Sequence, residues 1–135
     1  MLIVVDPHSG VPVYRQVMDQ IKFHVASGLL KPGEDLPSTR RLSAELGVNP
    51  MTISKAYSYL EREGAVERRP GRKLAVKTMN EDDALEGRKD QLAKHLGPIV
   101  TIVRQLGLTD EDALRVFGSV LRREAGESED HHGRS

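Results

Sequence analysis

The sequence predicts a mainly α-helical protein with a small β-wing: a winged helix-turn-helix domain followed by a short appendage of two helices. Three observations support this fold class. Two short helical patterns meet at Gly47, two short apolar strands flank a basic turn at 68–73, and an acidic segment with heptad-like apolar spacing begins at Asn80. At 135 residues the chain has room for one compact domain and an appendage.

The chain divides by composition and by its turn-forming residues. The expected segments are a lead at 1–10, the winged domain at 11–79 with its helix-turn-helix at about 38–63 and its wing at about 65–77, a helical dimerisation region at 80–123, and a disordered polar tail at 124–135.

The first helix opens at Pro12, and we place it at about 11–27. Its apolar positions recur at spacings of three and four, and polar side chains occupy the opposite face. Gly28 ends the helix, and Pro32-Gly33 prevents its continuation. The apolar stripe is expected to be core, and it comprises Tyr14, Val17 or Met18, Ile21 and Val25.

The second helix is expected at about 39–46. Ser38 stands where an N-cap belongs, and Leu42 and Leu46 face inward. Gly47 supplies the positive φ that a helix end requires. The loop at 29–37 before this helix is a candidate for a short edge strand.

The third helix begins with Asn49 as cap and Pro50 at the first helical position, where the missing N–H is not needed. Gly64 ends it near residue 63. The inward face is expected to hold Ile53, Ala56 or Tyr57, and Leu60, and the outward face Met51, Thr52, Ser54, Lys55 and Ser58.

The wing is expected as two strands at 65–69 and 73–77, joined by a turn at Pro70-Gly71. Val66, Leu74 and Val76 then point inward.

The appendage carries an apolar seam at heptad spacing. Asn80 caps an acidic first turn, Gly97-Pro98 predicts a kink or break, and Thr109 resembles a second helix start. Two such helices cannot bury this surface alone, so we favour packing against a second copy of the chain. The seam residues are Leu85, Leu92, Leu96, Ile99, Val103, Leu106, Leu114, Phe117 and Leu121.

The formal net charge is zero, but residues 11–79 carry 12 Lys/Arg against 7 Asp/Glu, whereas 80–135 carry 8 against 12. A basic first segment suits a nucleic-acid partner. The chain has no cysteine, no apolar run of the roughly 20 residues that a membrane span needs, and no basic start of a signal peptide. We expect a cytoplasmic protein without a membrane partner.

Nothing in the sequence predicts an enzyme, a cofactor or a metal site. It contains no phosphate loop, no metal-ligand pair on one helix face and no nucleophile–base set. His131-His132 lies in a polar tail and is expected to be solvated.

Several separated motifs, in order, cover about 11–78 and closely resemble the GntR family of bacterial transcription regulators. They are Pro12-Val13-Tyr14-Arg15-Gln16-Val17, Leu30-Lys31-Pro32-Gly33-Glu34-Asp35-Leu36-Pro37-Ser38-Thr39-Arg40, Leu46-Gly47-Val48-Asn49-Pro50-Met51-Thr52, Lys55-Ala56-Tyr57 and Leu60-Glu61-Arg62-Glu63-Gly64. The short appendage looks like that of the YtrA subfamily. The resemblance implies a homodimeric regulator of double-stranded operator DNA, commonly a repressor of an operon for an ABC-type transporter.

The resemblance also implies DNA contacts at matching positions. Arg40 matches an arginine at a phosphate or base, and Gly71 matches a wing glycine. The family's common Gly-x-Gly-x-Phe-Val becomes Gly71-Arg72-Lys73-Leu74-Ala75-Val76, so a second glycine is lost while the wing keeps its charge. With neighbouring residues, the expected interface is Ser38, Thr39, Arg40, Arg41, Asn49, Pro50, Thr52, Ser54, Lys55, Arg69, Gly71, Arg72 and Lys73.

The expected binding mode places the third helix in the major groove and the wing on phosphates or in the minor groove. The backbone amides at 49–52 are expected to suit a phosphate. Some roles stay open: Arg41 contacts DNA or pairs with Glu45. Tyr57 and Tyr59 are candidates for stacking on single-stranded bases, but Tyr57 is expected in the core, whereas Tyr59 stays open. The alternative function is a regulator whose C-terminal helices enclose a small-molecule effector, and a winged helix that binds only protein is a third.

Overall fold

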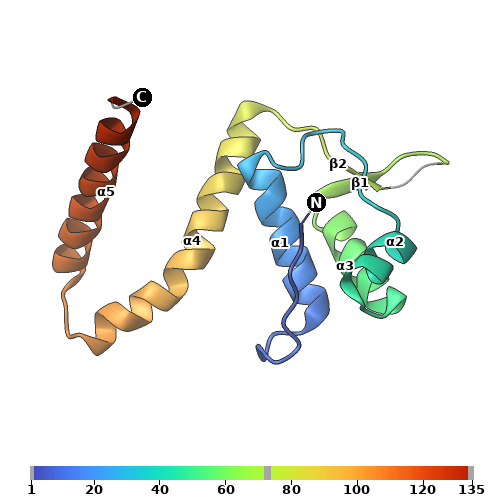
Figure 1. Ribbon diagram of the computed structural model, residues 1–135, viewed down its shortest axis with the longest axis horizontal. Coiled ribbons are helices and arrows are strands. Elements are labelled where there is room, and N and C mark those ends of the chain that lie inside the picture. Colours follow the sequence, from blue (N-terminus) through green and yellow to red (C-terminus); the bar gives the residue numbers. More distant parts are fainter. Residues whose placement is uncertain (1, 72–73, 134–135) are drawn as a thin grey trace. The chain divides into compact units, whose positions relative to one another are not determined.

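The computed structural model describes residues 2–71 and 74–133, which form two compact units, Met1–Leu92 and Ala93–Ser135. Figure 1 shows the elements in chain order. They are α1 (Val13–Ser27), α2 (Thr39–Leu46), α3 (Pro50–Arg62), β1 (Val66–Arg68), β2 (Leu74–Val76), α4 (Glu81–Gln105) and α5 (Asp110–Gly133).

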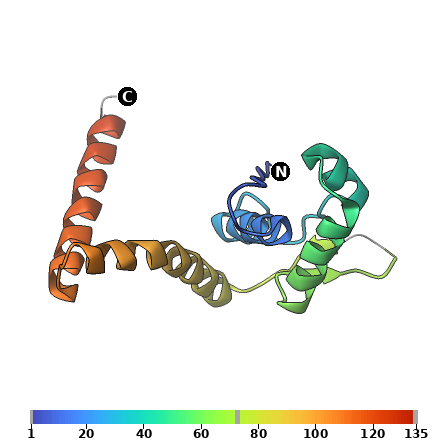
Figure 2. The ribbon, with the colours of Figure 1, turned by 90° about the horizontal axis from the view of Figure 1, so that it is seen from below.

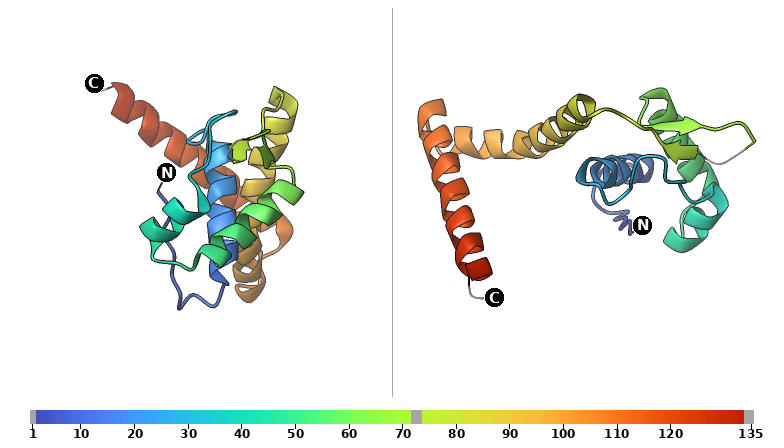
Figure 3. Two further views of the ribbon diagram at one scale, coloured as in Figure 1. Left: turned by 90° about the vertical axis from the view of Figure 1, so that its right-hand side faces the viewer. Right: turned by 90° about the horizontal axis from the view of Figure 1, so that it is seen from above.

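The first unit packs α1 and α2 against α3, with the β-hairpin beside the carboxyl end of α3 (Figures 2 and 3). Most residues of the expected inward faces are buried, including Ile21, Leu42, Ile53 and Leu60 at 1% exposure or less. Tyr14, Val25 and Leu46 are half-buried and pack against this core. Since α3 contacts both other helices and β1, its inner face is held from several sides and its outer face is fixed in direction.

The two strands pair antiparallel as the expected hairpin, with Val66 opposite Val76 and Arg68 opposite Leu74. The other edge of β2 is also paired. Leu36 N donates to Leu74 O at 2.8 Å, and Val76 N donates to Glu34 O at 2.8 Å. The expected edge segment in the loop at 29–37 is thus present as a bridge, and it anchors the base of the wing to the core.

The residues before α1 pack closely against the rest of the first unit. The sequence predicts only a lead segment there, without contacts to the core. Ile3 is buried in the core. Gln20 exchanges two hydrogen bonds with the backbone of Val4, and Gln16 does the same with Asp6, at 2.6–2.9 Å. These amides occupy the polar face of α1, so that face also has a structural role.

The helix starts of the appendage follow the sequence. Asn80 Oδ1 accepts from Asp83 N at 2.8 Å, and Thr109 Oγ1 accepts from Asp112 N at 3.1 Å. Pro98 lies inside α4 without ending it, so of the expected kink or break the break is absent. Of the expected disordered tail at 124–135, the part up to Gly133 is helical, as the end of α5, and 134–135 lie outside the described residues.

The second unit leaves its apolar side chains uncovered. Along the seam, Leu96 and Val103 are half-buried and the other residues are exposed, with Leu106 at 67% and Leu114 at 71%. The part of α4 after Ala93 and α5 make few contacts beyond the turn that joins them (Figure 2). No described helix combines the length and apolar character that crossing a bilayer requires.

Candidate nucleic-acid interface

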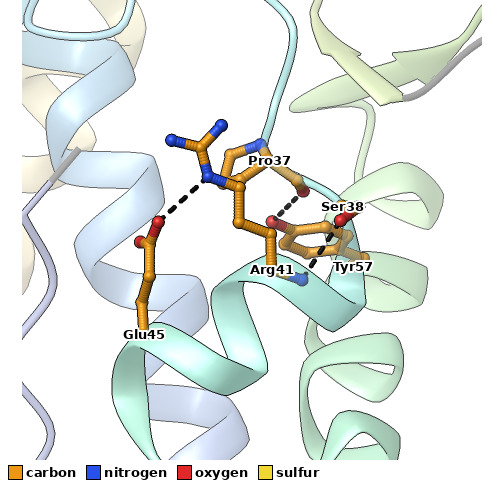
Figure 4. Close-up of polar contacts among 5 residues, drawn as sticks. All are labelled: Pro37, Ser38, Arg41, Glu45 and Tyr57. Carbon is orange, nitrogen blue, oxygen red and sulfur yellow. Dashed lines mark hydrogen bonds and ion pairs between the residues drawn. The ribbon is translucent and has the colours of Figure 1, made fainter.

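The entry to α2 is fixed by two side-chain hydrogen bonds (Figure 4). Ser38 Oγ accepts from Arg41 N at 3.1 Å, which is the expected N-cap. Tyr57, from α3, donates its hydroxyl to Pro37 O at 2.8 Å. Tyr57 is buried, as expected, and this burial, reinforced by the charge of Glu45, raises the pKa of its hydroxyl. The start of α2 is therefore tied directly to α3.

The turn between α2 and α3 is closed by local contacts. Gly47 has φ +65°, the left-handed conformation that glycine adopts without a steric penalty. Ser43 Oγ donates to Val48 O, and Val48 N donates to Ser43 O at 3.1 Å. Asn49 then caps α3, with its Oδ1 accepting from Met51 N at 2.8 Å. These bonds fix the direction in which α3 leaves the turn.

The backbone amides at the start of α3 are less available than expected. Pro50 has no N–H, Met51 N donates to the Asn49 side chain, and Thr52 N donates to Asn49 O at 2.9 Å. The amides of Met51 and Thr52 are therefore already engaged within the protein, and the phosphate site expected at 49–52 stays a prediction. Asn49 retains its Nδ2 donor group, and it is exposed.

The outer face of α3 presents the side chains that the sequence placed there. Met51 is 74% exposed, and Lys55 and Ser58 are exposed. Thr52 and Ser54 are half-buried at the margin of this face. Pro50 is exposed at its start. The face is polar apart from Met51, and it carries one cation.

The arginines of α2 differ in their surroundings. Arg40 is exposed, and within the described part of the chain no carboxylate pairs with it. Arg41 pairs with Glu45 at 3.1 Å, so one of the two alternatives for Arg41 is present (Figure 4). Ser38 and Thr39 are half-buried beside them. Arg40 is therefore the arginine of α2 whose charge remains available to a partner.

Lys55 lies in an aromatic arrangement that sequence reasoning did not find. Its Nζ lies 4.1 Å from the ring centroid of Tyr14 on α1. The Tyr14 ring stacks on Tyr59 with centroids 5.6 Å apart, and Arg62 Cζ lies 5.3 Å from the Tyr59 centroid. The only signal in the sequence was the spacing Lys55, Tyr59, Arg62 on α3, and nothing linked Tyr14 to it.

Two of the expected basic side chains of the wing lie against other parts of the first unit. Arg68 pairs with Glu61 at 3.6 Å, and the half-buried Arg69 folds back so that its Nη2 would lie 3.3 Å from a Cβ placed at Gly33. Gly71 is exposed with φ +65°. The expected contacts Arg72 and Lys73 lie outside the described residues.

The resulting surface would fit a polyanionic partner that itself has a groove to receive a helix. It combines the exposed face of α3, the unpaired Arg40 and the hairpin with its basic residues. Among the described side chains, no group of three or more His, Cys, Asp or Glu could hold a metal ion.

Comparisons with known proteins agree with this arrangement. Residues 13–76 match the family "Bacterial regulatory proteins, gntR family". The chain is 35% identical over 107 residues to the transcriptional repressor YtrA of Bacillus subtilis, covering 79% of this chain and 82% of that protein. It is 34% identical over 116 residues to the regulator Rv1152 of Mycobacterium tuberculosis, covering 86% and 91%.

Solved structures give the same result. YtrA from Sulfolobus acidocaldarius, a GntR-family transcription factor, aligns with a TM-score of 0.55 at 33% identity and covers 90% of this chain and 97% of that one. A transcriptional regulator from Oenococcus oeni aligns with a TM-score of 0.68 at 26% identity, covering 90% and 97%. The chain therefore belongs to the GntR family, and it is a DNA-binding transcription regulator rather than an enzyme.

Proposed function

We propose that the protein is a homodimeric repressor that binds a pseudo-palindromic operator, with α3 in the major groove and the basic wing on the adjoining backbone. The observation that carries this proposal is the outer face of α3. Met51, Lys55 and Ser58 are solvent-exposed on it, and the helix is fixed in direction by the Tyr57–Pro37 hydrogen bond and by the Asn49 cap. A fixed polar helix of this size fits the major groove, where base pairs present distinguishable patterns.

Within this interface the residues divide by chemistry. Lys55 and Asn49 carry hydrogen-bond donors on or beside the outer face of α3, where they can reach base edges or phosphates. We propose that α2 crosses the DNA backbone, where the exposed Arg40 supplies a positive charge for a phosphate. Thr52 can offer a methyl group to thymine or a hydroxyl to phosphate. Arg69, Gly71, Arg72 and Lys73 form the proposed wing contact.

The dimer is supported by the second unit. An open apolar groove of about 600 Å³ lies between α4 and α5, lined by residues such as Ile99, Val103 and Phe117. Exposed apolar side chains extend beyond the groove to Leu121, on the same helix. The apolar surface that runs from the groove to Leu121 is larger than a small molecule covers. A second copy of the same two helices would cover it symmetrically.

The groove also favours the second candidate function, a regulator that responds to an apolar effector bound between α4 and α5. A compound that raises the melting temperature and changes operator affinity in parallel would support it. Compounds that raise the melting temperature only of a variant impaired in dimerisation would instead indicate that the groove is the dimer interface.

The regulated operon is proposed from the resemblance to YtrA-type proteins, and it is one that encodes an ABC-type transporter. Recovering the genomic fragments that the protein binds, and measuring transcripts with and without the protein, tests this assignment. Binding upstream of other genes, or transcripts that fall when the protein is removed, would contradict the operon or the repressor assignment.

The main experiment selects bound fragments from random DNA. We expect a two-fold symmetric consensus with half-sites about one helical turn, or a multiple of it, apart. If about six phosphates are neutralised per dimer, affinity should fall by roughly three decades between 50 and 200 mM salt. A single unrepeated consensus would contradict the dimer, and the absence of salt-dependent binding would contradict the function.

A further inference from the structure

The contact between Tyr14 and Lys55 has no role in the interface described so far. Tyr14 lies in the first turn of α1, and Lys55 lies on the outer face of α3, yet the ammonium Nζ is 4.1 Å from the ring centroid. A lysine cation at this distance is attracted by the negative face of the ring. The contact therefore joins a proposed DNA-reading side chain to a helix that carries no proposed DNA contact.

We propose that Tyr14 is a positioning residue for DNA recognition, whose ring holds the Lys55 ammonium in the orientation in which it meets the operator. This inference rests on the proposed function, in which Lys55 contacts DNA. Lysine has a flexible four-carbon stem, and ordering it on binding opposes association. A contact that already orders the side chain in the free protein reduces that loss.

The ring is itself held in place. Tyr14 is half-buried and packs against the core. It also stacks on Tyr59, with centroids 5.6 Å apart and ring planes at 25°. Lys55 and Tyr59 are four residues apart on α3, so they share one helix face. The fold thus fixes the ring, and the ring restricts the more mobile lysine.

The contact orients the ammonium without neutralising it. An ammonium group has three N–H donors, and a ring beneath it engages only one side. Within the described residues no carboxylate pairs with Lys55. The remaining donors are therefore available to a phosphate or a base edge.

The first test uses the free protein and needs no DNA. Protons that lie over an aromatic ring are shifted upfield in NMR spectra, so the ε-methylene protons of Lys55 should show such a shift. Tyr14→Phe should retain the shift because it keeps the ring, whereas Tyr14→Leu should abolish it. An unshifted lysine in the wild type, or a shift that survives Tyr14→Leu, would overturn the inference.

The second test measures affinity for DNA that the wild-type protein has selected from a random pool. Tyr14→Leu should weaken binding about 3- to 10-fold, and Tyr14→Phe should bind nearly as the wild type does. In the Lys55→Ala background, Tyr14→Leu should cause no further loss. Base preference should relax at the same operator position in Tyr14→Leu and in Lys55→Ala.

The matched control is Phe23→Leu, the same kind of change on the same helix, which should leave affinity unchanged. Melting curves of each variant separate loss of contact from loss of folding. If Tyr14→Leu is unfolded, the Lys55 shift in the wild type and in Tyr14→Phe and the affinity of Lys55→Ala still decide, because an unshifted lysine or normal binding by Lys55→Ala overturns the inference. Additive losses, tighter binding by Tyr14→Leu, or normal binding by Lys55→Ala would overturn this inference alone. A wild-type protein that binds no DNA would overturn the proposed function as well.

Discussion

The two units use the same amphipathic helix pattern with opposite results. In the first unit, apolar side chains on α1, α2 and α3 meet one another and the hairpin, and Ile53 and Leu60 have no exposed surface. In the second unit, apolar side chains at equivalent spacing stay exposed, with Leu114 at 71%. Periodicity therefore identifies the apolar face of a helix, but it does not identify what covers that face.

This difference separates two kinds of stability. The first unit contains its own core, so its folding depends on contacts within one chain. The second unit lacks a core of that kind, so its order depends on a surface supplied from elsewhere, which we propose is a second copy. Each prediction below tests that division.

The largest effect is expected in the core of the first unit. Leu60→Ala should lower the free energy of unfolding by about 3 kcal/mol, because it removes buried methyl groups and leaves a cavity. Urea unfolding measures the change. The matched variant Leu114→Ala should have an effect that depends on protein concentration, as expected for a side chain covered only in a dimer. Equal losses for both variants at every concentration would remove the distinction between the units.

Charge placed on the seam, which begins at the end of the first unit and continues through the second, should break the dimer without unfolding the core of the first unit. Val103→Asp, like Leu92→Asp, should weaken dimerisation by about a hundredfold, because an unpaired carboxylate would be buried in the interface. Equilibrium sedimentation measures dimerisation, and operator affinity should fall with it. Thr101→Asp, at an exposed position of α4 outside the seam, is the control. A dimer that survives both seam variants would place the interface elsewhere.

Within the first unit, binding should be separable from stability. Arg40→Ala should cost about 2 kcal/mol of operator binding and leave the melting temperature nearly unchanged, because Arg40 is exposed. Arg41→Ala should cost less, since its charge is already paired with Glu45. Gel-shift titrations at one salt concentration measure both variants. An Arg40→Ala protein that binds normally would exclude this residue from the interface.

The smallest effect concerns the hydroxyl of Tyr57. Tyr57→Phe should lower stability by about 1 kcal/mol, because the hydrogen bond to Pro37 O is lost. The folded state raises the pKa of this hydroxyl above its ordinary value of 10.0, so the stabilisation is complete below pH 10 and is lost as the pH rises above it. Urea unfolding should show the two proteins converging above about pH 10. A constant difference at all pH values would contradict this assignment.

Local signals in the sequence were enough for the elements of the first unit. The Ser38 cap, the glycine at position 47 and the Asn49-Pro50 start each act through neighbouring residues, and α2 occupies the expected range. The hairpin itself was also predicted, with Val66, Leu74 and Val76 buried as expected. Such features depend on a few residues and can be predicted without tertiary contacts.

Other features depend on contacts between distant residues and could not be predicted. Gln16 and Gln20 have the pattern of solvated side chains, yet they bind the backbone before α1. The Tyr14–Tyr59 stack joins two helices whose relative rotation the sequence does not specify. The amides at the start of α3 were expected to suit a phosphate, yet Met51 N donates to the side chain of the cap residue Asn49. Which amide a cap residue binds depends on the folded backbone, so the motif alone does not show it.

The hydrogen bond from Tyr57 to Pro37 has a practical consequence for protein engineering. It ties α2 and α3 together through inward-facing atoms, while Met51 and Ser58 lie on the opposite surface and take no part in the core. A combinatorial library at these two outer positions can therefore be screened for altered operator preference on an unchanged scaffold, provided that Tyr57, Ile53 and Leu60 are kept.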